Sequence, residues 1–524
     1  MHKLGWLRTL RIFLSVVLLP LTALVFLDTD QWIPVRLINT VTWPQFIPSF
    51  LHFFNSGGLF ASGFLFILLM TIVFGRVYCS GICPLGTIQD IIFRFRSGFF
   101  GQKPLRYEKA RNIFRFSILT LVIVSFLSGT AILLNMLDPY SNFGRMMSNI
   151  FRPVFLFSGN ELAGILEDQN IYWLSKTEFK GFQAASIAFS SGFLLLVGWL
   201  SVFHGRLYCN TLCPVGALLG LTSKFSLFKL RLNQQDCNSC GQCSKVCKAQ
   251  CIDIKTKTID FSRCVSCYNC LSACPSDGVL FSCSLKAEDS VLETARTGKA
   301  NKRRALIKAF VFSSSILAVK AYATRITGGE KPTEIPEERT LVSSPPGSGS
   351  HDHFNGNCTA CHLCISICPT QVLQPSLLHY GLHGILQPYM DYHAGFCNFE
   401  CDLCGKVCPT NAIKSLVPEQ KKRVQIGKAV FIKENCIVYT DNTDCGACSE
   451  HCPTKAVNMV QYKERLTIPE INNNICIGCG ACEYACPTKP YRAIFIEGND
   501  IHRLADKPVQ EEIKRKATTE DFPF

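Results

Sequence analysis

Several motifs of redox enzymes are absent from this 524-residue sequence. No G-x-G-x-x-G motif follows a strand-like segment, so we do not expect an intrinsic nicotinamide site. Only His52 and His204 lie near apolar segments, which is too few to hold a bis-histidine haem in a membrane. No small-residue cleavage site stands near Asp28, so the first apolar segment is expected to remain as an anchor rather than a removed signal peptide.

Cysteine, by contrast, is abundant, with 30 residues in the chain. A high cysteine count indicates either a disulfide scaffold or a metal-cluster protein, and disulfide scaffolds are mostly short secreted chains. Here the cysteines recur as tight triplets in a long chain that also has several apolar segments. The pattern therefore favours metal ligation.

Four apolar segments have the composition of membrane spans, which need about 20 apolar residues. They are Ile12–Leu27, Gly57–Phe74, Phe116–Leu137 and Ala184–Phe203. The first is short and contains Pro20, but three further segments follow it. We therefore predict a four-span helical membrane domain over residues 1–231.

The orientation follows from Lys and Arg, which are enriched in cytoplasmic loops. Residues 1–11, 76–116 and 206–231 together carry fifteen of these residues, whereas 29–56 and 138–183 carry five. The N-terminus is thus predicted to be cytoplasmic, with the second set of loops outside. The same asymmetry explains the net charge of +14 without nucleic-acid binding.

Beyond the membrane domain, the sequence predicts two cysteine-rich modules on opposite sides of a bacterial cytoplasmic membrane. The first, 232–284, is cytoplasmic. Residues 300–323 begin with a basic cluster that includes Arg303-Arg304, followed by an apolar run, which resembles a twin-arginine export signal. This fifth, signal-anchor-like helix would place the second module, 358–524, outside the cytoplasm. The Pro-, Gly- and Ser-rich stretch 324–357 between them is predicted to be a linker.

Six cysteine motifs in these modules follow the two-cluster ferredoxin pattern C-x2-C-x2-C-x3-C-P. In that pattern three thiolates bind one [4Fe–4S] cluster and the fourth binds its neighbour. The cytoplasmic motifs are Cys237, Cys240, Cys243, Cys247 and Cys264, Cys267, Cys270, Cys274. The C-terminal motifs are Cys358, Cys361, Cys364, Cys368; Cys397, Cys401, Cys404, Cys408; Cys436, Cys445, Cys448, Cys452; and Cys476, Cys479, Cys482, Cys486. We predict two α+β ferredoxin-like modules holding six [4Fe–4S] clusters.

Departures from the pattern leave this prediction standing. In two C-terminal motifs the first loop is longer, with three residues between Cys397 and Cys401 and eight between Cys436 and Cys445, but the rest of the motif is kept. Lys248 replaces the proline after Cys247, so either Cys247 or Cys251 could be the fourth ligand of that motif. Zinc sites draw two separated cysteine pairs together, which is not the arrangement here. The C-x-x-C-H sequence that ends at His362 resembles a haem attachment signal, but haem would remove two cluster ligands from a complete motif.

Two further cysteine pairs repeat at the cytoplasmic ends of the second and fourth spans. The segments 75–86 and 205–216 share the frame G-R-x-Y-C-x3-C-P-x-G, with cysteines Cys79, Cys83, Cys209 and Cys213. Residues i and i+4 lie on one helix face, so the two halves could bring four thiols together. They would then bind a further cluster or cycle as disulfides. The alternative is a structural role, with Arg76 and Arg206 extending toward the membrane surface.

The four spans, the repeated C-x3-C-P motifs and the first two-cluster module resemble the NapH/NosR family of membrane ferredoxins. The region from about residue 300 resembles the NapG and MauM ferredoxins, in its export-like start, in Pro345-Pro346-Gly347 and in its four motifs. The chain thus looks like a fusion of the two types. The resemblance implies quinol oxidation and electron delivery to an extracytoplasmic reductase.

Three functions fit these features. The chain could be a quinol dehydrogenase that uses the quinone pool. It could instead be an electron-conducting subunit of a larger membrane complex without its own substrate, or a reductase that matures or reactivates a periplasmic metalloenzyme. All three require a redox partner protein, and in all three the clusters carry the electrons while the protein tunes them.

Overall fold

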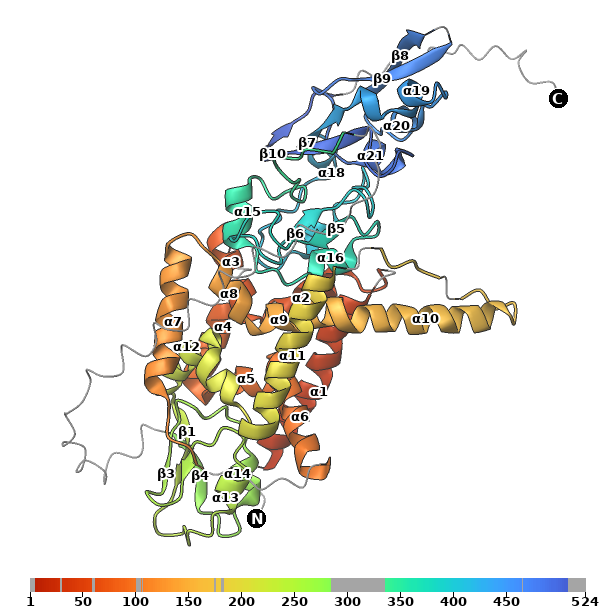
Figure 1. Ribbon diagram of the computed structural model, residues 1–524. Helices are drawn as coiled ribbons and strands as arrows, with labels where there is room; N and C mark the ends of the chain where they lie inside the picture. The colour runs from red at the N-terminus through yellow and green to blue at the C-terminus, as the bar shows by residue number, and fades with distance from the viewer. Residues whose placement is uncertain are drawn as a thin grey trace, which may run out of the picture.

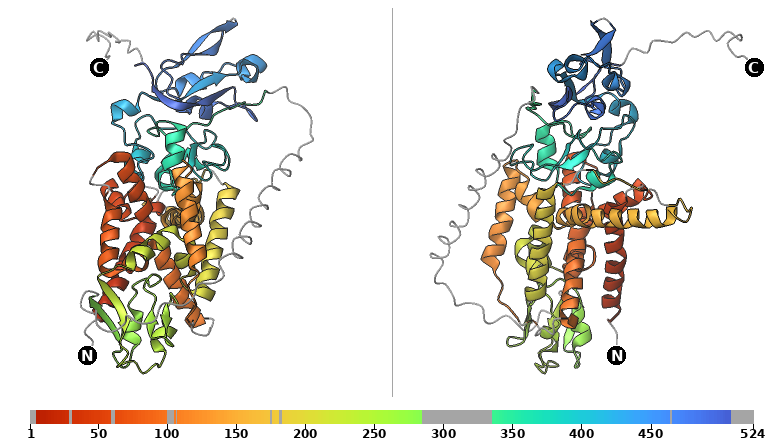
Figure 2. Two further views of the ribbon diagram at one scale, coloured as in Figure 1. Left: turned by 90° about the vertical axis from the view of Figure 1, so that its left-hand side faces the viewer. Right: turned by 45° about the vertical axis from the view of Figure 1, so that its right-hand side comes forward.

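The computed structural model describes residues 5–28, 31–58, 62–99, 105, 107–173, 176–180, 183–283, 335–463 and 465–507. A helical domain occupies the middle of the molecule, and the two cysteine-rich modules lie at its opposite ends (Figure 1). The same separation is visible from two other directions (Figure 2). The predicted signal-anchor helix, 300–323, lies outside the described residues.

The helical domain is built from two similar halves. The first half contains α1 (Gly5–Leu27), α2 (Val35–Thr42), α3 (Phe46–Ser56), α4 (Gly63–Phe74), α5 (Val77–Gly81) and α6 (Pro84–Phe99). The second contains α7 (Asn112–Leu127), α8 (Ile132–Leu137), α9 (Pro139–Met146), a π-helical segment Met147–Phe151, α10 (Arg152–Glu167), α11 (Ala184–His204), a second π-helical segment Tyr208–Leu212 and α12 (Pro214–Ser223).

The two halves pack crosswise. The helix before the cysteine turn of each half contacts the last helix of the other half: α4 packs on α12, and α11 packs on α6. Within each half, α1 packs on α5 and α6, and α7 packs on Tyr208–Leu212 and α12. The repeated sequence frame therefore corresponds to a repeated structural unit.

Two of the four predicted spans are helices long and apolar enough to cross a membrane, α1 and α11. The other two are shorter apolar helices, α4 and α7. Gly57 ends α3 in the left-handed conformation at φ 64°, so the predicted second span begins at Gly63 instead. Gly129, at φ 82°, separates α7 from α8 within the predicted third span. Glycine adopts these conformations without the steric cost that other residues carry.

The first cysteine-rich module is a small α+β unit. It contains β1 (Phe228–Leu232), α13 (Gln242–Lys245), β2 (Ile252–Asp253), β3 (Thr258–Ile259), α14 (Asn269–Ala273) and β4 (Val279–Cys283). Strand β1 pairs antiparallel with β4, and β2 with β3. The two short helices each follow the first cysteines of a motif.

The second module repeats this construction at larger size. Its elements are α15 (His351–Asn357), α16 (Leu363–Ile367), β5 (Leu373–Pro375), β6 (Pro388–Met390), α17 (Leu403–Val407), α18 (Pro418–Lys421), β7 (Val424–Phe431), α19 (Ile437–Thr440), α20 (Ala447–Glu450), β8 (Val457–Lys463), β9 (Leu466–Ile471), α21 (Ala481–Ala485) and β10 (Ile494–Leu504). Antiparallel pairs form between β5 and β6, β7 and β10, and β8 and β9.

The predicted linker 324–357 is not a linker over its second half. Residues 335–357 pack against the module, and Ser344 and Ser348 are completely buried. The Glu497 carboxylate of β10 accepts the backbone N–H of Leu341 at 2.9 Å. Small hydroxyl side chains fit this close packing because a neighbour satisfies them, here His502 at 2.9 Å from Ser344 Oγ.

Candidate iron–sulfur centres

In the first module the thiols form two sets, each made of three cysteines from one motif and the fourth cysteine of the other motif. Cys243 interacts electrostatically with Cys237, Cys240 and the fourth cysteine of the other motif, Cys274. In the second set Cys270 interacts with Cys264, Cys267 and Cys247. Each set is the arrangement that one [4Fe–4S] cluster requires.

A fifth thiol stands beside the second set. Cys251 is 1% exposed, and its sulfur lies 3.6 Å from that of Cys247. It also interacts with Cys264. Both thiols that the sequence offers as the fourth ligand thus lie next to the same three cysteines.

The second module forms four such sets, again with the fourth cysteine exchanged between neighbouring motifs. They are Cys358, Cys361, Cys364 with Cys408; Cys397, Cys401, Cys404 with Cys368; Cys436, Cys445, Cys448 with Cys486; and Cys476, Cys479, Cys482 with Cys452. The irregular spacings in the second and third motifs do not prevent this exchange.

Burial disfavours the charged thiolate form of these cysteines when no metal is bound. It raises the pKa of Cys243 to about 11 and the pKa values of Cys361 and Cys448 to about 12. Bound iron stabilises a thiolate and so offsets the cost of burying it. The donor set and its burial therefore fit iron–sulfur clusters.

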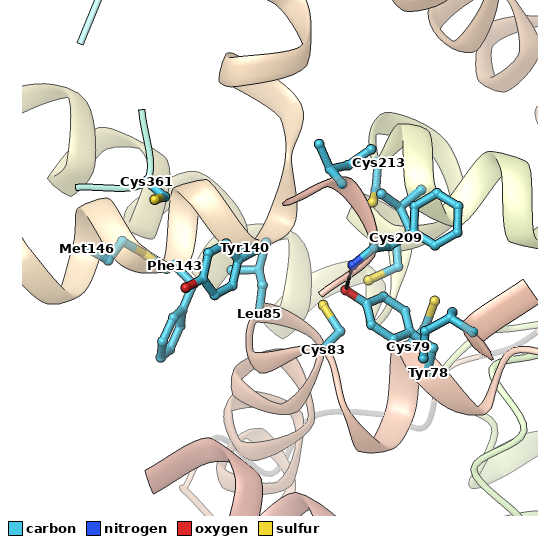
Figure 3. Close-up of a cluster of buried hydrophobic side chains, with 14 of the residues drawn as sticks. Tyr78, Cys79, Cys83, Leu85, Tyr140, Phe143, Met146, Cys209, Cys213 and Cys361 are labelled. Atoms are coloured by element: carbon cyan, nitrogen blue, oxygen red, sulfur yellow. Dashed lines mark hydrogen bonds between the residues drawn. The ribbon is translucent and has the colours of Figure 1, made fainter. Parts of the chain in front are cut away.

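The two C-x3-C-P repeats bring a further four thiols together inside the helical domain. Cys79, Cys83, Cys209 and Cys213 are each at most 5% exposed. They interact electrostatically across the two repeats, and their side chains lie together in Figure 3. We refer to these four residues as the four-cysteine centre.

Each repeat supplies an arginine that reaches into the other repeat. Arg76 donates to the Cys209 carbonyl at 3.1 Å, and Arg206 donates to the Cys79 carbonyl at 2.7 Å. Both also lie near a sulfur of their own repeat, Arg76 at 3.8 Å from Cys79 and Arg206 at 3.7 Å from Cys209. They are 0% and 1% exposed, so the alternative that they extend to the membrane surface is wrong.

Gly86 and Gly216 of the shared frame allow α6 and α12 to pack closely against the cysteine turns that precede them. A β-carbon at Gly86 would lie 2.2 Å from the Cys79 carbonyl oxygen, and one at Gly216 would lie 2.0 Å from that of Cys209. Only glycine fits at either position. The repeated Pro-x-Gly thus sets the distance between each last helix and its own cysteine turn.

Asp90 of α6, which the sequence analysis missed, connects three basic residues beside the centre. Its carboxylate contacts Arg11 at 2.9 Å, Arg206 at 2.7 Å and Lys248 at 3.0 Å. A signal was available, because Asp90 is the only acidic residue between positions 31 and 107. An isolated acid in an apolar segment is typically functional.

The first ferredoxin module packs directly on the two repeats. The Lys248 carbonyl accepts the backbone N–H of Arg206 at 3.0 Å, where a β-carbon on Gly205 would clash with it. On the other repeat, Ser266 Oγ donates to the Phe74 carbonyl at 3.2 Å. Each glycine–arginine pair therefore meets one of the two cluster motifs.

The second module packs on the opposite end of the same domain. A β-carbon on Gly144 of α9 would lie 2.2 Å from the Cys361 carbonyl oxygen. Helix α9 also packs on α6, and in Figure 3 Tyr140 and Leu85 lie between Cys361 and Cys83. Loops predicted to be outside make this contact, as when Asn55 donates to the Thr410 carbonyl at 2.9 Å.

His362 takes part in this interface and is not available to a haem. Its Nε2 donates to the Leu386 carbonyl at 2.9 Å, so Nδ1 accepts from Ser148 Oγ at 3.2 Å. Burial and the neighbouring Arg145 lower the pKa of His362 to about 3, which keeps the ring neutral.

Comparisons with known proteins agree with an iron–sulfur protein. A 4Fe-4S binding domain matches residues 56–103 and 187–233, which contain the two C-x3-C-P repeats, and a 4Fe-4S dicluster domain matches residues 442–489. The chain is 25% identical over 293 residues to YccM of Escherichia coli K12, whose name proposes electron transport, covering 54% of this chain and 70% of YccM.

Two ferredoxin-type proteins are also similar. Identity to NapH of Escherichia coli K12 is 26% over 215 residues, or 38% of this chain and 60% of NapH. Identity to the methylamine utilization protein MauM of Methylophilus methylotrophus is 33% over 150 residues, or 27% of this chain and 65% of MauM.

Proposed function

This chain is a homologue of NapH-, MauN-, MauM- and YccM-like ferredoxin-type proteins and carries 4Fe-4S domains, and from that premise we propose that it conducts electrons across the bacterial cytoplasmic membrane. The resemblance makes a quinol the proposed donor and an extracytoplasmic redox protein the proposed acceptor. The six thiol sets would hold six [4Fe–4S] clusters, and the four-cysteine centre would hold a seventh. Each cluster, when bound, supplies a one-electron redox centre.

The observation that carries this proposal is the position of the four-cysteine centre. It lies within a helical domain whose opposite ends contact the two ferredoxin modules (Figure 1). The first module reaches it through Arg206 and Lys248. The second module contacts α9 of the same domain. Helix α9 packs on α6, and α6 begins directly after Cys83. Electrons that pass between the modules need a carrier between these two contacts.

Buried positive charge favours a cluster over a disulfide at this centre. Three basic residues share the single carboxylate of Asp90, and Arg76 donates only to neutral groups and the Cys79 sulfur among the described residues. An uncompensated buried charge is costly. A cluster held by four thiolates carries net negative charge and would balance the excess, whereas two disulfides are neutral.

Metal analysis tests the number of clusters. Anaerobically purified chain is expected to contain about 28 iron atoms, four for each of seven clusters. The Cys83→Ser, Cys213→Ser double variant should fall to about 24. The control is Cys283→Ser, because Cys283 lies at the end of β4 and belongs to no thiol set. A wild-type value near eight, or stoichiometric zinc, would contradict the proposal.

Electron transfer in sealed vesicles tests the route. A membrane-impermeant donor that reduces the first module should also reduce the C-terminal clusters in wild type and in Cys283→Ser. The double variant should keep the spectra of both modules but lose this transfer. If it reduces the C-terminal clusters at the wild-type rate, the four-cysteine centre is structural and the proposed route is wrong.

A further inference from the structure

A pocket separate from the thiol sets opens where the helical domain meets the first ferredoxin module. It lies between the beginning of α7 and the end of α11, beside the turn that follows Cys247. Its lining includes Lys109, Arg111, Arg115, His204 and Arg263. Among the described residues that line it, Glu108 is the only acidic one, and it is paired with Arg111 at 2.7 Å. The pocket therefore carries net positive charge, with Lys109 and Arg115 forming no ion pair among the described residues.

Two of the basic side chains in this pocket are buried with unsatisfied donors. Arg115 is 2% exposed, and within the described part of the chain its Nε and Nη1 have no hydrogen-bond partner. Arg263 is 7% exposed; its Nε pairs with the Asp260 carboxylate at 2.8 Å, and its Nη2 has no hydrogen-bond partner among the described residues. Buried donors without partners are costly, and several cations close together add repulsion. An anion with several oxygens would satisfy both.

The pocket stands at the edge of an apolar surface. On α7, directly after the pocket residue Asn112, Ile113 is 72% and Phe114 52% exposed. On α11, just before His204, Trp199 and Phe203 are about half exposed. A ligand with an anionic group for the pocket and hydrocarbon for these helix faces matches both properties.

We propose that the pocket binds the phosphate of an anionic phospholipid whose acyl chains lie along α7 and α11. Basic pockets between membrane helices on the cytoplasmic side suit such headgroups. Because the pocket also includes Ala249 and Gln250, which follow Cys247 in the first module, the bound lipid would contact the junction of that module with the membrane domain. The proposal does not depend on whether the four-cysteine centre holds a cluster.

Lipid retention by the full chain tests the proposal. Purified protein in detergent is titrated with phosphatidylglycerol, with phosphatidylcholine and with inorganic phosphate, and bound molecules are counted by native mass spectrometry. Wild type should retain phosphatidylglycerol over phosphatidylcholine and should not bind inorganic phosphate at similar concentration. In Lys109→Gln, Arg111→Gln, phosphatidylglycerol binding should be about 30-fold weaker, because two basic residues near the headgroup are lost.

A matched variant removes the same charge elsewhere on the same predicted side. Lys224→Gln, Lys255→Gln changes two exposed residues that do not line the pocket and should leave the preference unchanged. Equal retention of the two lipids, or equal loss in both variants, would overturn the proposal. So would binding of inorganic phosphate alone, which would identify a free-anion site, or displacement of the lipid by a soluble quinone analogue, which would identify a quinone site.

Discussion

At the scale of single residues, Lys248 replaces the proline of the ferredoxin motif and has a structural role of its own. Proline follows the last cysteine in the other five ferredoxin motifs. A proline at 248 could not supply the ammonium group that pairs with Asp90 at 3.0 Å. The substitution thus attaches the first module to α6, the helix that begins directly after Cys83.

The buried charges around Asp90 give a prediction at this scale. Asp90→Asn leaves Arg11, Arg206 and Lys248 without their carboxylate and should destabilise the chain by about 3–5 kcal/mol, because breaking a buried ion pair leaves charges uncompensated. Denaturant unfolding in detergent measures the loss. As a control, Glu167→Gln breaks the more exposed pair with Lys176 and should cost about 0–1 kcal/mol. Equal losses in the two variants would mean that the Asp90 network adds no stability.

At the scale of elements, the cysteine turns are defined by contacts between helices. Helix α6 begins directly after Cys83 and α12 directly after Cys213, each with proline at its first position. Proline suits that position because it has no backbone N–H to satisfy there. The glycine two residues later lies against the preceding cysteine turn.

Substitution of this glycine gives a prediction at the element scale. Gly86→Ala places a β-carbon 2.2 Å from the Cys79 carbonyl oxygen and 2.8 Å from Arg206 Nη1. We expect a loss of about 1–3 kcal/mol from overpacking. Iron should fall by about four atoms per chain, one cluster, while the spectra of the ferredoxin modules persist.

Gly159→Ala in α10 is the matched control for this change. No atom of the described residues lies within 4 Å of a β-carbon at Gly159, and alanine is a better helix former than glycine by up to about 1 kcal/mol. It should leave iron content unchanged. Normal iron content in Gly86→Ala would show that the four-cysteine centre tolerates displacement of α6.

At the scale of the whole molecule, the two modules lie at opposite ends of the helical domain (Figure 2). The loops 29–56 and 138–183, predicted to be outside from their low basic content, contribute residues that contact the second module, among them Asn55 and Glu178. The predicted sides of the loops and of this module are therefore mutually consistent.

Reporter fusions test the orientation that follows. A reporter after Cys283 should be active in the cytoplasm, and one after Thr340 should be active outside it. Arg303→Lys with Arg304→Lys should retain the second module inside, because the export-like signal is weakened. Activity of both reporters on one side would exclude electron conduction across the membrane by this chain alone. An intact chain on a denaturing gel checks that no cleavage after Ala323 separates the modules.

The sequence alone determined the features that depend on local spacing. Cysteines three residues apart followed by proline predict cluster ligation because ligand geometry acts over a single turn of chain. The repeated C-x3-C-P frame placed Cys79 and Cys209 in short helical turns. Cys83 and Cys213, expected on the same helix face, are instead the non-helical residues directly before α6 and α12. Apolar length predicted the α1 and α11 helices, while glycine-induced ends shortened the other two expected spans.

Only the tertiary structure decided which distant residues meet. Arg76 and Arg206 cross between repeats, and Asp90 joins Arg11 to Lys248, contacts that span up to 158 residues of the chain. No periodicity encodes such pairs, since they depend on how two halves pack. The same packing turned the Ser-rich segment before α15 from an expected linker into buried structure, because burial of its hydroxyls depends on partners in β10 that lie more than a hundred residues away.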